Sequence, residues 1–161
     1  MIRAASGDDV KQIKSLIDYW SGKGAMLSRS TDDITENFPE FLVWENDNRV
    51  LGIICLDVNG KTATIRTLCV SPNHKGQGIG TALVNATLNE AKVKGVETVY
   101  AVTNNIGFFN KFGFSKNKTI LSDGQEKAYM TIGISRLAAM NSSSMALAAS
   151  SENCSKGCLQ K

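Results

Sequence analysis

The 161-residue sequence contains little histidine and little proline, with one histidine, His74, and two prolines. A single histidine excludes a metal site built from several histidines, so we expect no metal. A Ser-His-Asp or Cys-His catalytic arrangement would have to use His74. That residue lies in the glycine-containing segment "NHKGQG", where a histidine is usually a solvated loop residue. Zinc enzymes and nucleophilic hydrolases are therefore disfavoured.

Long hydrophobic runs are also lacking. No segment approaches the about 20 apolar residues that span a bilayer, and the start "MIRAASGDDV" has no signal-peptide core. The net charge of +3 suits a small anionic ligand better than nucleic acid, which needs a clustered basic face. We expect a cytoplasmic monomer or homodimer that binds a small molecule, and neither nucleic acid nor membrane.

The four cysteines fall into two groups. Cys55 and Cys69 lie in apolar strand-like segments, where a free cysteine usually behaves as a small buried hydrophobe. Cys154 and Cys158 lie in residues 135–161, a Ser- and Ala-rich stretch without aromatic residues. We expect residues 1–134 to form one domain and residues 135–161 to form a disordered tail. A disulfide framework is not expected in a reducing compartment.

The periodicity of the first 134 residues predicts alternating strands and helices. The predicted strands cover residues 1–4, 40–45, 49–58, 61–70, 96–102 and 127–134. The predicted helices cover residues 6–20, 31–38, 78–94 and 104–112. Ser6 and Asp9 form a variant capping box at the first helix start, and Gly95 ends the third helix. This order predicts an α/β (α+β) fold, with helices on the faces of a mixed central sheet.

The segment "VSPNHKGQGIGTALV" places three glycines between a strand and a helix: Gly76, Gly78 and Gly80. The first-turn amides of a helix are unpaired, and the helix dipole adds partial positive charge, so this junction predicts an anion site. Two known phosphate loops do not fit. The nucleotide loop needs Gly-Lys-Ser/Thr where the chain reads Gly-Thr-Ala, and the dinucleotide fingerprint needs its third glycine one position later.

The same segment resembles the acetyl-CoA motif of the GNAT acetyltransferase superfamily, Arg/Gln-x-x-Gly-x-Gly/Ala, with Lys75 in the first position. The resemblance covers residues 1–134 and implies a mostly antiparallel GNAT-like sheet and acetyl-CoA as co-substrate. It implies that the amides of residues 77–81 hold the pyrophosphate and that the strand "TLCV" pairs with the pantetheine arm. The backbone amide of Cys69 or Val70 would polarise the thioester carbonyl during direct attack by an amine. The implied cofactor-binding residues are Leu68, Cys69, Val70, Lys75, Gly76, Gln77, Gly78, Ile79, Gly80, Thr81, Asn104, Phe108 and Phe109.

The segment "NNIGFFNKFGF" resembles a second family motif in shortened form. Many members place a tyrosine there that protonates the departing thiolate, and Phe109 occupies that position in this chain. The thiol of coenzyme A has roughly the acidity of free cysteine, so it can leave as thiolate near neutral pH. Tyr129, Tyr100 or a water molecule could also supply the proton.

Three segments, "GAMLSRSTDDI", "IRTLCVSPNHKGQGIG" and "VYAVTNNIGFFNKFGF", are together similar to N-acetylglutamate synthases and related amino-acid acetyltransferases. These relatives also carry phenylalanine in place of the tyrosine. A free amino acid needs its carboxylates held, and guanidinium is a natural partner, so Arg29 and Arg66 are the candidate substrate-binding residues. A carboxylate acting through water, from Glu40, Glu45 or Asp57, could deprotonate the amine.

The sequence therefore predicts an N-acetyltransferase that acts on the primary amine of a small molecule, with the α-amine of an amino acid such as glutamate as first choice. Two alternatives stay open at this point. The acceptor could instead be a polyamine, an antibiotic or a protein amine, for which an acidic pocket would be expected. The domain could also be a coenzyme A-binding sensor without turnover, an alternative that the phenylalanine at position 109 favours.

Overall fold

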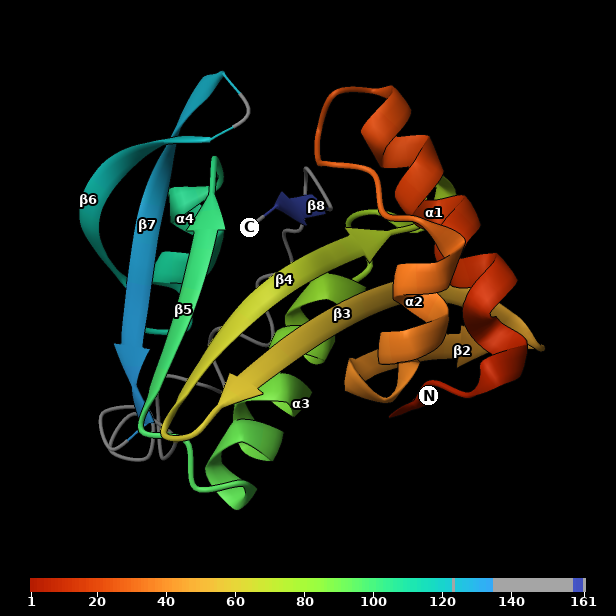
Figure 1. Ribbon diagram of the computed structural model, residues 1–161, viewed down its shortest axis with the longest axis horizontal. Helices are drawn as coiled ribbons and strands as arrows, with labels where there is room; N and C mark the ends of the chain where they lie inside the picture. The colour runs from red at the N-terminus through yellow and green to blue at the C-terminus, as the bar shows by residue number, and fades with distance from the viewer. Residues whose placement is uncertain (123, 135–157, 161) are drawn as a thin grey trace.

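The computed structural model describes residues 1–122, 124–134 and 158–160 (Figure 1). The predicted disordered tail, residues 135–161, therefore lies outside the described residues except for Cys158–Gln160. Those three residues form a short strand, β8, that pairs with β4, Thr62–Val70. The structure therefore contains a strand within the segment that we expected to be disordered.

One sheet runs through the whole domain in the order β1-β2-β3-β4-β5-β7-β6, with β8 paired to β4 off this path. All neighbouring pairs are antiparallel except β4 and β5, which are parallel. The expected mixed, mostly antiparallel sheet with helices on its faces is thereby confirmed. The remaining strands are β1, Ile2–Ala4; β2, Phe41–Asn46; β3, Arg49–Asn59; β5, Thr98–Thr103; β6, Ser115–Ser122; and β7, Gln125–Gly133.

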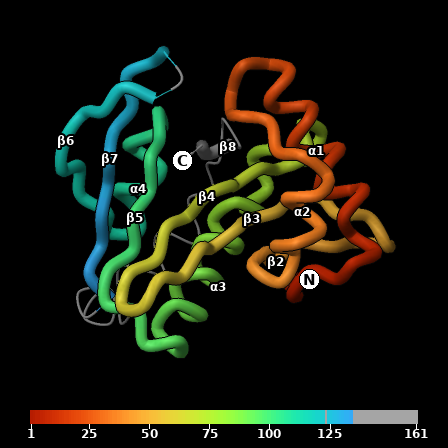
Figure 2. The backbone as a smooth tube through the Cα atoms, viewed as in Figure 1, coloured from red at the N-terminus to blue at the C-terminus, as the bar shows by residue number. Residues whose placement is uncertain are grey.

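Helices cover both faces of the sheet (Figures 1 and 2). On one face lie α1, Val10–Gly22, and α2, Thr31–Asn37, over β2 to β4. On the other lie α3, Ile79–Val93, and α4, Ile106–Asn110. The described residues also form three short 3-10 helices: η1, Gly7–Asp9; η2, Phe38–Glu40; and η3, Pro72–His74.

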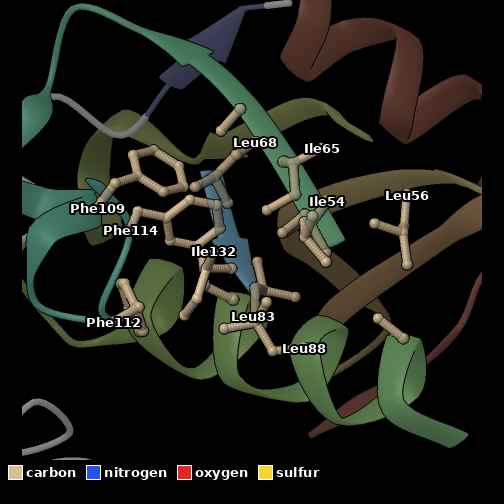
Figure 3. Packing of buried hydrophobic residues seen from close by; sticks show 14 of the residues in the cluster. Ile54, Leu56, Ile65, Leu68, Leu83, Leu88, Phe109, Phe112, Phe114 and Ile132 are labelled. Carbon is tan, nitrogen blue, oxygen red and sulfur yellow. The ribbon is translucent and has the colours of Figure 1, made fainter. Parts of the chain in front are cut away.

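Each face of the sheet has its own apolar core. The core beneath α3 and α4 is drawn in Figure 3, where Leu83 and Leu88 of α3 pack beside Ile54 and Ile65 of the sheet. The core beneath α1 and α2 contains Ile13, Ile17, Trp20, Ile34, Phe41, Ile53 and Cys69. From Leu68 to Val70, successive residues of β4 alternate between the two cores, because side chains of a strand point to opposite faces. Leu68 therefore faces α3 and α4, and Cys69 faces α1 and α2.

Besides β8, the strand β6 was not predicted. The expected single final strand is a hairpin of β6 and β7, and β6 has the sequence "SKNKTILS" with almost every residue exposed. An edge strand exposed in this way carries no alternation of apolar and polar residues, so its periodicity gives no signal.

The N-terminal helix is held by a buried carboxylate. Arg3 of β1 donates two hydrogen bonds to Asp9, of 2.7 and 2.9 Å, and the Ser6 amide donates a third of 2.8 Å. The predicted capping interaction between Ser6 and Asp9 is therefore present. The hydrogen bonds from Arg3 hold the pKa of Asp9 at about 2, below its usual value of 3.8.

We expect Asp9→Asn to lower the free energy of unfolding by about 2 kcal/mol at pH 7. Because the folded-state pKa is lowered, this stabilisation is present above about pH 4 and disappears as the pH falls towards 2. Chemical denaturation at several pH values measures it. The control is Asp18→Asn, which removes the exposed pair of Lys14 and Asp18 and should cost about 0.5 kcal/mol or less. Equal losses in the two variants would contradict the prediction.

Candidate functional site

The parallel strands β4 and β5 pair over only half of β4. Thr62 to Ile65 of β4 lie opposite Thr98 to Ala101 of β5, whereas β3 pairs with β4 as far as Val70. The two parallel strands then diverge, and β8 lies in the space between them (Figure 1). The backbone edge of β4 beyond Ile65 is therefore not paired with β5, in the stretch that sequence similarity assigned to pantetheine.

The glycine loop joins the end of β4 to the start of α3. Gly76 and Gly78 have φ values of 77° and 80°, the left-handed region that glycine adopts most readily. A Cβ atom added at either position would meet nothing within 4 Å. Gly78 is the N-cap of α3, and the first bond of the helix runs from the Ala82 amide to the Gly78 carbonyl. The first-turn amides before Ala82 are thus left to a ligand, as an anion site requires.

A third glycine, Gly52 of β3, sets the position of this helix start. A Cβ atom there would lie 2.6 Å from Cγ2 of Ile79 and 3.0 Å from Cδ1 of Leu83. The absence of a side chain lets the first turns of α3 pack directly on the strand. At the same end of the sheet, the Ser71 amide donates a 2.7 Å hydrogen bond to the Leu51 carbonyl.

The residues at this junction fit a pyrophosphate. Thr81 is 2% exposed, and its hydroxyl oxygen has no hydrogen-bond partner among the described residues. The ammonium group of Lys75 lies 4.8 Å from the ring centroid of Trp20, beside the loop. The Trp20 indole N–H donates a 2.9 Å hydrogen bond to the Val70 carbonyl, which fixes α1 to the end of β4. Positive charge, helix amides without intrahelical partners and a buried hydroxyl therefore occur within residues 75–81.

A pocket of about 210 Å³ lies on the α1 and α2 side of β4. Both predicted substrate-binding arginines, Arg29 and Arg66, line this pocket, which we call the arginine pocket. The lining residues are Met26, Leu27, Ser28, Arg29, Asp33, Arg66 and Thr67. Because Cys69 packs in the same apolar core as Met26, this pocket opens near the diverging part of β4.

Arg29 is rigidly held, with its side chain only 9% exposed. It donates to both carboxylate oxygens of Asp33 at 2.6 and 3.2 Å and to the Thr67 hydroxyl at 3.2 Å. Its guanidinium lies 5.2 Å from the Phe41 ring centroid. The hydrogen bonds from Arg29 lower the pKa of Asp33, which stays ionised at neutral pH. Arg66 is freer, with 32% exposure and a contact of 3.8 Å to Asp57.

Six predicted cofactor-binding side chains lie in the two cores: Leu68, Cys69, Val70, Ile79, Phe108 and Phe109. Leu68, Phe108 and Phe109 are at most 3% exposed, and the ring of Phe109 contacts Phe108 and Phe114 edge-on at 5.1 and 5.2 Å. Leu68 can therefore offer a ligand only its backbone. Asn104 lies in a different pocket, with residues of β6 and β7. The cofactor contacts assigned to these residues stay predictions.

The candidate proton-transfer groups are scattered. Glu45 binds Arg3 at 2.8 Å beside the N-terminal strand, and it does not line the pocket of Arg29 and Arg66. Glu40 lies 3.8 Å from the Cys55 sulfur, and burial raises the pKa of that thiol to about 11. Neither Glu40 nor Asp57 lines the arginine pocket.

Tyr100 and Tyr129, the alternative donors, stack together with ring centroids 5.5 Å apart. Burial raises the pKa of Tyr129, so its hydroxyl keeps its proton at neutral pH. A proton donor must carry its proton before the leaving group departs, and Tyr129 meets that requirement.

Three polar residues of the pocket were missed by sequence reasoning: Ser28, Asp33 and Thr67. Asp33 lies four residues after Arg29, a spacing typical of helical ion pairs, which is a usable signal. Thr67 occupies a strand position where threonine is common for reasons of β-propensity, so nothing in the sequence marks it.

The profile of the Acetyltransferase (GNAT) family matches residues 9–114, which run from η1 through the glycine loop to the end of the α4 segment. The chain belongs to the GNAT family. It is therefore an acetyl-CoA-dependent N-acyltransferase, as the sequence motifs predicted. The divergence of β4 and β5 and the glycine loop are the features of this GNAT domain to which the motif resemblance assigns the acetyl donor, and that assignment stays a prediction.

Similar proteins include amino-acid acetyltransferases. The amino-acid acetyltransferase of Mycobacterium tuberculosis is 32% identical over 120 residues, which cover 72% of this chain and 68% of that protein. N-acetylglutamate synthase from Neisseria gonorrhoeae, solved with coenzyme A and N-acetyl-glutamate, gives a TM-score of 0.76 at 24% identity. That match covers 83% of this chain and 35% of the synthase, so the chain spans about a third of that protein.

The fold is shared with enzymes of other specificity. Ribosomal-protein-alanine N-acetyltransferase from Brucella melitensis gives a TM-score of 0.73 at 18% identity, over 83% of this chain and 99% of that one. Identity this low shows the fold alone, because one fold hosts many functions. The acceptor must therefore be argued from the site.

Two kinds of feature are absent from the part of the chain that the structure describes. It contains no group of three or more His, Cys, Asp or Glu side chains placed to hold a metal ion. Its helices are also too short or too polar to cross a membrane.

We expect Gly78→Ala to weaken coenzyme A binding roughly tenfold, because a Cβ at a φ of 80° strains the loop and displaces an amide that binds the ligand. Isothermal titration calorimetry measures the affinity. The matched control is Gly60→Ala in the β3–β4 hairpin, with a φ of 65° and equally open surroundings. Both variants should lose about 1–2 kcal/mol of stability. Equal effects on coenzyme A affinity would contradict the assignment of the loop.

Proposed function

We propose that this GNAT domain, residues 1–134, transfers the acetyl group of acetyl-CoA to the α-amine of a small amino acid, with glutamate as the first candidate. The observation that carries the proposal is the arginine pocket beside the diverging end of β4. An amino acid presents an anionic carboxylate next to its amine, and guanidinium binds carboxylate through paired hydrogen bonds. This activity would belong to amino-acid metabolism in the cytoplasm.

The N–H groups of Arg29 that are not already hydrogen-bonded limit what this side chain can bind. A guanidinium has five N–H groups, and three of them are used by Asp33 and Thr67. A side-chain hydrogen bond to the Cys55 thiol uses a fourth N–H group, which leaves one to donate to a substrate carboxylate. Asp33 balances the charge of Arg29 but leaves Arg66 with only a long contact to Asp57. A substrate with two carboxylates, such as glutamate, would engage both arginines.

The reaction we propose is direct. The acceptor amine, after loss of a proton to a water held by a carboxylate, attacks the thioester carbonyl carbon. The new C–N bond forms, the nitrogen releases its second proton to water, the C–S bond breaks, and the sulfur leaves as thiolate or takes a proton from Tyr129 or water. The amide of Cys69 or Val70 at the end of β4 would stabilise the oxyanion. Cys69 and Val70 are both buried, at 0% and 1% exposed, so an amide there acts away from bulk water.

The relatives support this acceptor class without deciding it. The Mycobacterium tuberculosis relative is named an amino-acid acetyltransferase, and the Neisseria synthase was solved with N-acetyl-glutamate. A cationic acceptor, such as a polyamine, is the alternative that Asp33 would favour. Because Asp33 is already bound by Arg29 through two hydrogen bonds, we consider the anionic acceptor the better fit.

Release of coenzyme A thiol from acetyl-CoA, measured against a panel of amino acids and cationic amines, tests the proposal. The blank is the enzyme without acceptor, because the chain has cysteines of its own. Acceleration by glutamate or another acidic amino acid is the expected result. Acceleration by polyamines or peptides alone would overturn the amino-acid proposal and leave the acetyl-CoA chemistry intact.

We expect Arg29→Gln to raise the KM for the amino-acid acceptor roughly tenfold to hundredfold, through loss of a charge-assisted hydrogen bond. The KM for acetyl-CoA should change about twofold or less, since Arg29 lies in the pocket and not at the glycine loop. Arg49→Gln, at an exposed site on β3, is the matched control and should leave both constants unchanged. Similar increases in both KM values would remove Arg29 from the acceptor site.

A further inference from the structure

The short strand β8 lies where the parallel strands β4 and β5 separate (Figure 1). It pairs with β4 in antiparallel register, with Thr67 opposite Gln160, Leu68 opposite Leu159 and Cys69 opposite Cys158. These positions begin two residues after Ile65, the last residue of β4 that pairs with β5. The part of the β4 edge that does not pair with β5 is thus covered by β8, a segment almost a hundred residues further along the chain.

An open strand edge selects its ligand by backbone chemistry. Unpaired N–H and C=O groups bind any extended group that offers amides at the spacing of a strand. A peptide such as β8 is one such ligand. The pantetheine arm of acetyl-CoA, which contains two amide groups in an extended chain, is another. Both would need the same edge of β4.

We propose that β8 and the pantetheine arm compete for the edge of β4 at Thr67 to Cys69, so that acetyl-CoA must displace β8 in order to bind. This inference rests on the proposed placement of pantetheine along Leu68, Cys69 and Val70. It makes the C-terminal segment an internal competitor of the acetyl donor. The form of the chain with β8 docked is closed to acetyl-CoA, and the undocked form is open.

Attachment to the domain makes so short a strand an effective competitor. A free tripeptide would bind an edge weakly, but a tethered one acts at an effective concentration that can reach the millimolar range. The apparent Kd for acetyl-CoA rises in proportion to the inverse of the open fraction. If about nine molecules in ten hold β8 docked, the full chain binds acetyl-CoA about tenfold more weakly than a chain in which β8 cannot dock.

Calorimetric titration of the full chain and of Leu159→Pro with acetyl-CoA measures this difference. Proline at the centre of β8 removes an amide N–H and fixes φ, which prevents strand pairing. We expect the Kd of the variant to be about tenfold lower than that of the full chain. Lys156→Pro, the same substitution two residues before β8, is the control and should leave the Kd unchanged. Equal Kd values for Leu159→Pro and the full chain would overturn the proposal.

A disulfide test examines the competition without relying on affinity. Residues directly opposite in an antiparallel pair have Cα atoms about 4.5 to 5.5 Å apart, within the range that a disulfide spans. Treatment with oxidised glutathione should therefore join Cys69 to Cys158, with the two thiols oxidised and the glutathione disulfide reduced to two thiols. Acetyl-CoA, which has no free thiol, should suppress this bond. Cys158→Ser should abolish it, and Cys154→Ser should not.

The outcomes separate this inference from the proposed function. No Cys69–Cys158 bond in the free chain would contradict docking of β8. An equal yield of that bond with and without saturating acetyl-CoA would contradict competition. Neither measurement uses an acceptor, so a chain that passes both tests and acetylates no amino acid would overturn only the proposed acceptor.

Discussion

The structure depends on one parallel strand pair in a sheet that is otherwise antiparallel. Parallel strands need a crossover between them, and here the crossover is the glycine loop and α3, which leave β4 at one end and return to β5 at the other. The start of α3 is therefore forced to the end of β4. Because β5 pairs only with the first half of β4, an anion-binding helix start and an open strand edge occur side by side.

The packing around this junction holds the start of α3 and the open edge of β4 in place. Gly52 lets α3 lie directly on β3, so the free amides of the helix keep a fixed position relative to the strand end. Trp20 joins the other face to the same point through its hydrogen bond to Val70 and its contact with Lys75. The proposed donor and acceptor sites thus share one strand, with the donor expected along the backbone edge of β4 and the acceptor expected beside Arg66 and Thr67.

Local chemistry made much of the fold predictable. The Ser6 and Asp9 cap, the positive φ at Gly95 and the glycines of the loop each have a physical reason that sequence alone reveals. The sequence did not predict the exposed strand β6, because an edge strand in solvent has no alternation of apolar and polar residues. The sequence did not predict strand β8, because this strand depends on pairing with the open edge of β4 and has no local sequence pattern of its own.

The site was predictable to the extent that it depends on the backbone. Glycines mark positions where a ligand can approach the backbone closely, so the sequence indicates the loop as a candidate site. Side-chain contacts were harder to predict, because they depend on which helices and strands pack together in the fold. Glu45 was a candidate base until the fold placed Arg3 beside it, and Thr67 became notable only when Arg29 of a distant loop reached its hydroxyl.

The most direct test of the account is a nitrogen-15 NMR titration of the chain with coenzyme A. If the open edge and the helix start receive the ligand, the largest amide shifts will fall at residues 68–70 and 76–81. The amides of Thr62 to Ile65, which remain in the sheet beside β5, will change little. Saturable binding with its largest shifts outside the loop and the end of β4 would contradict the account.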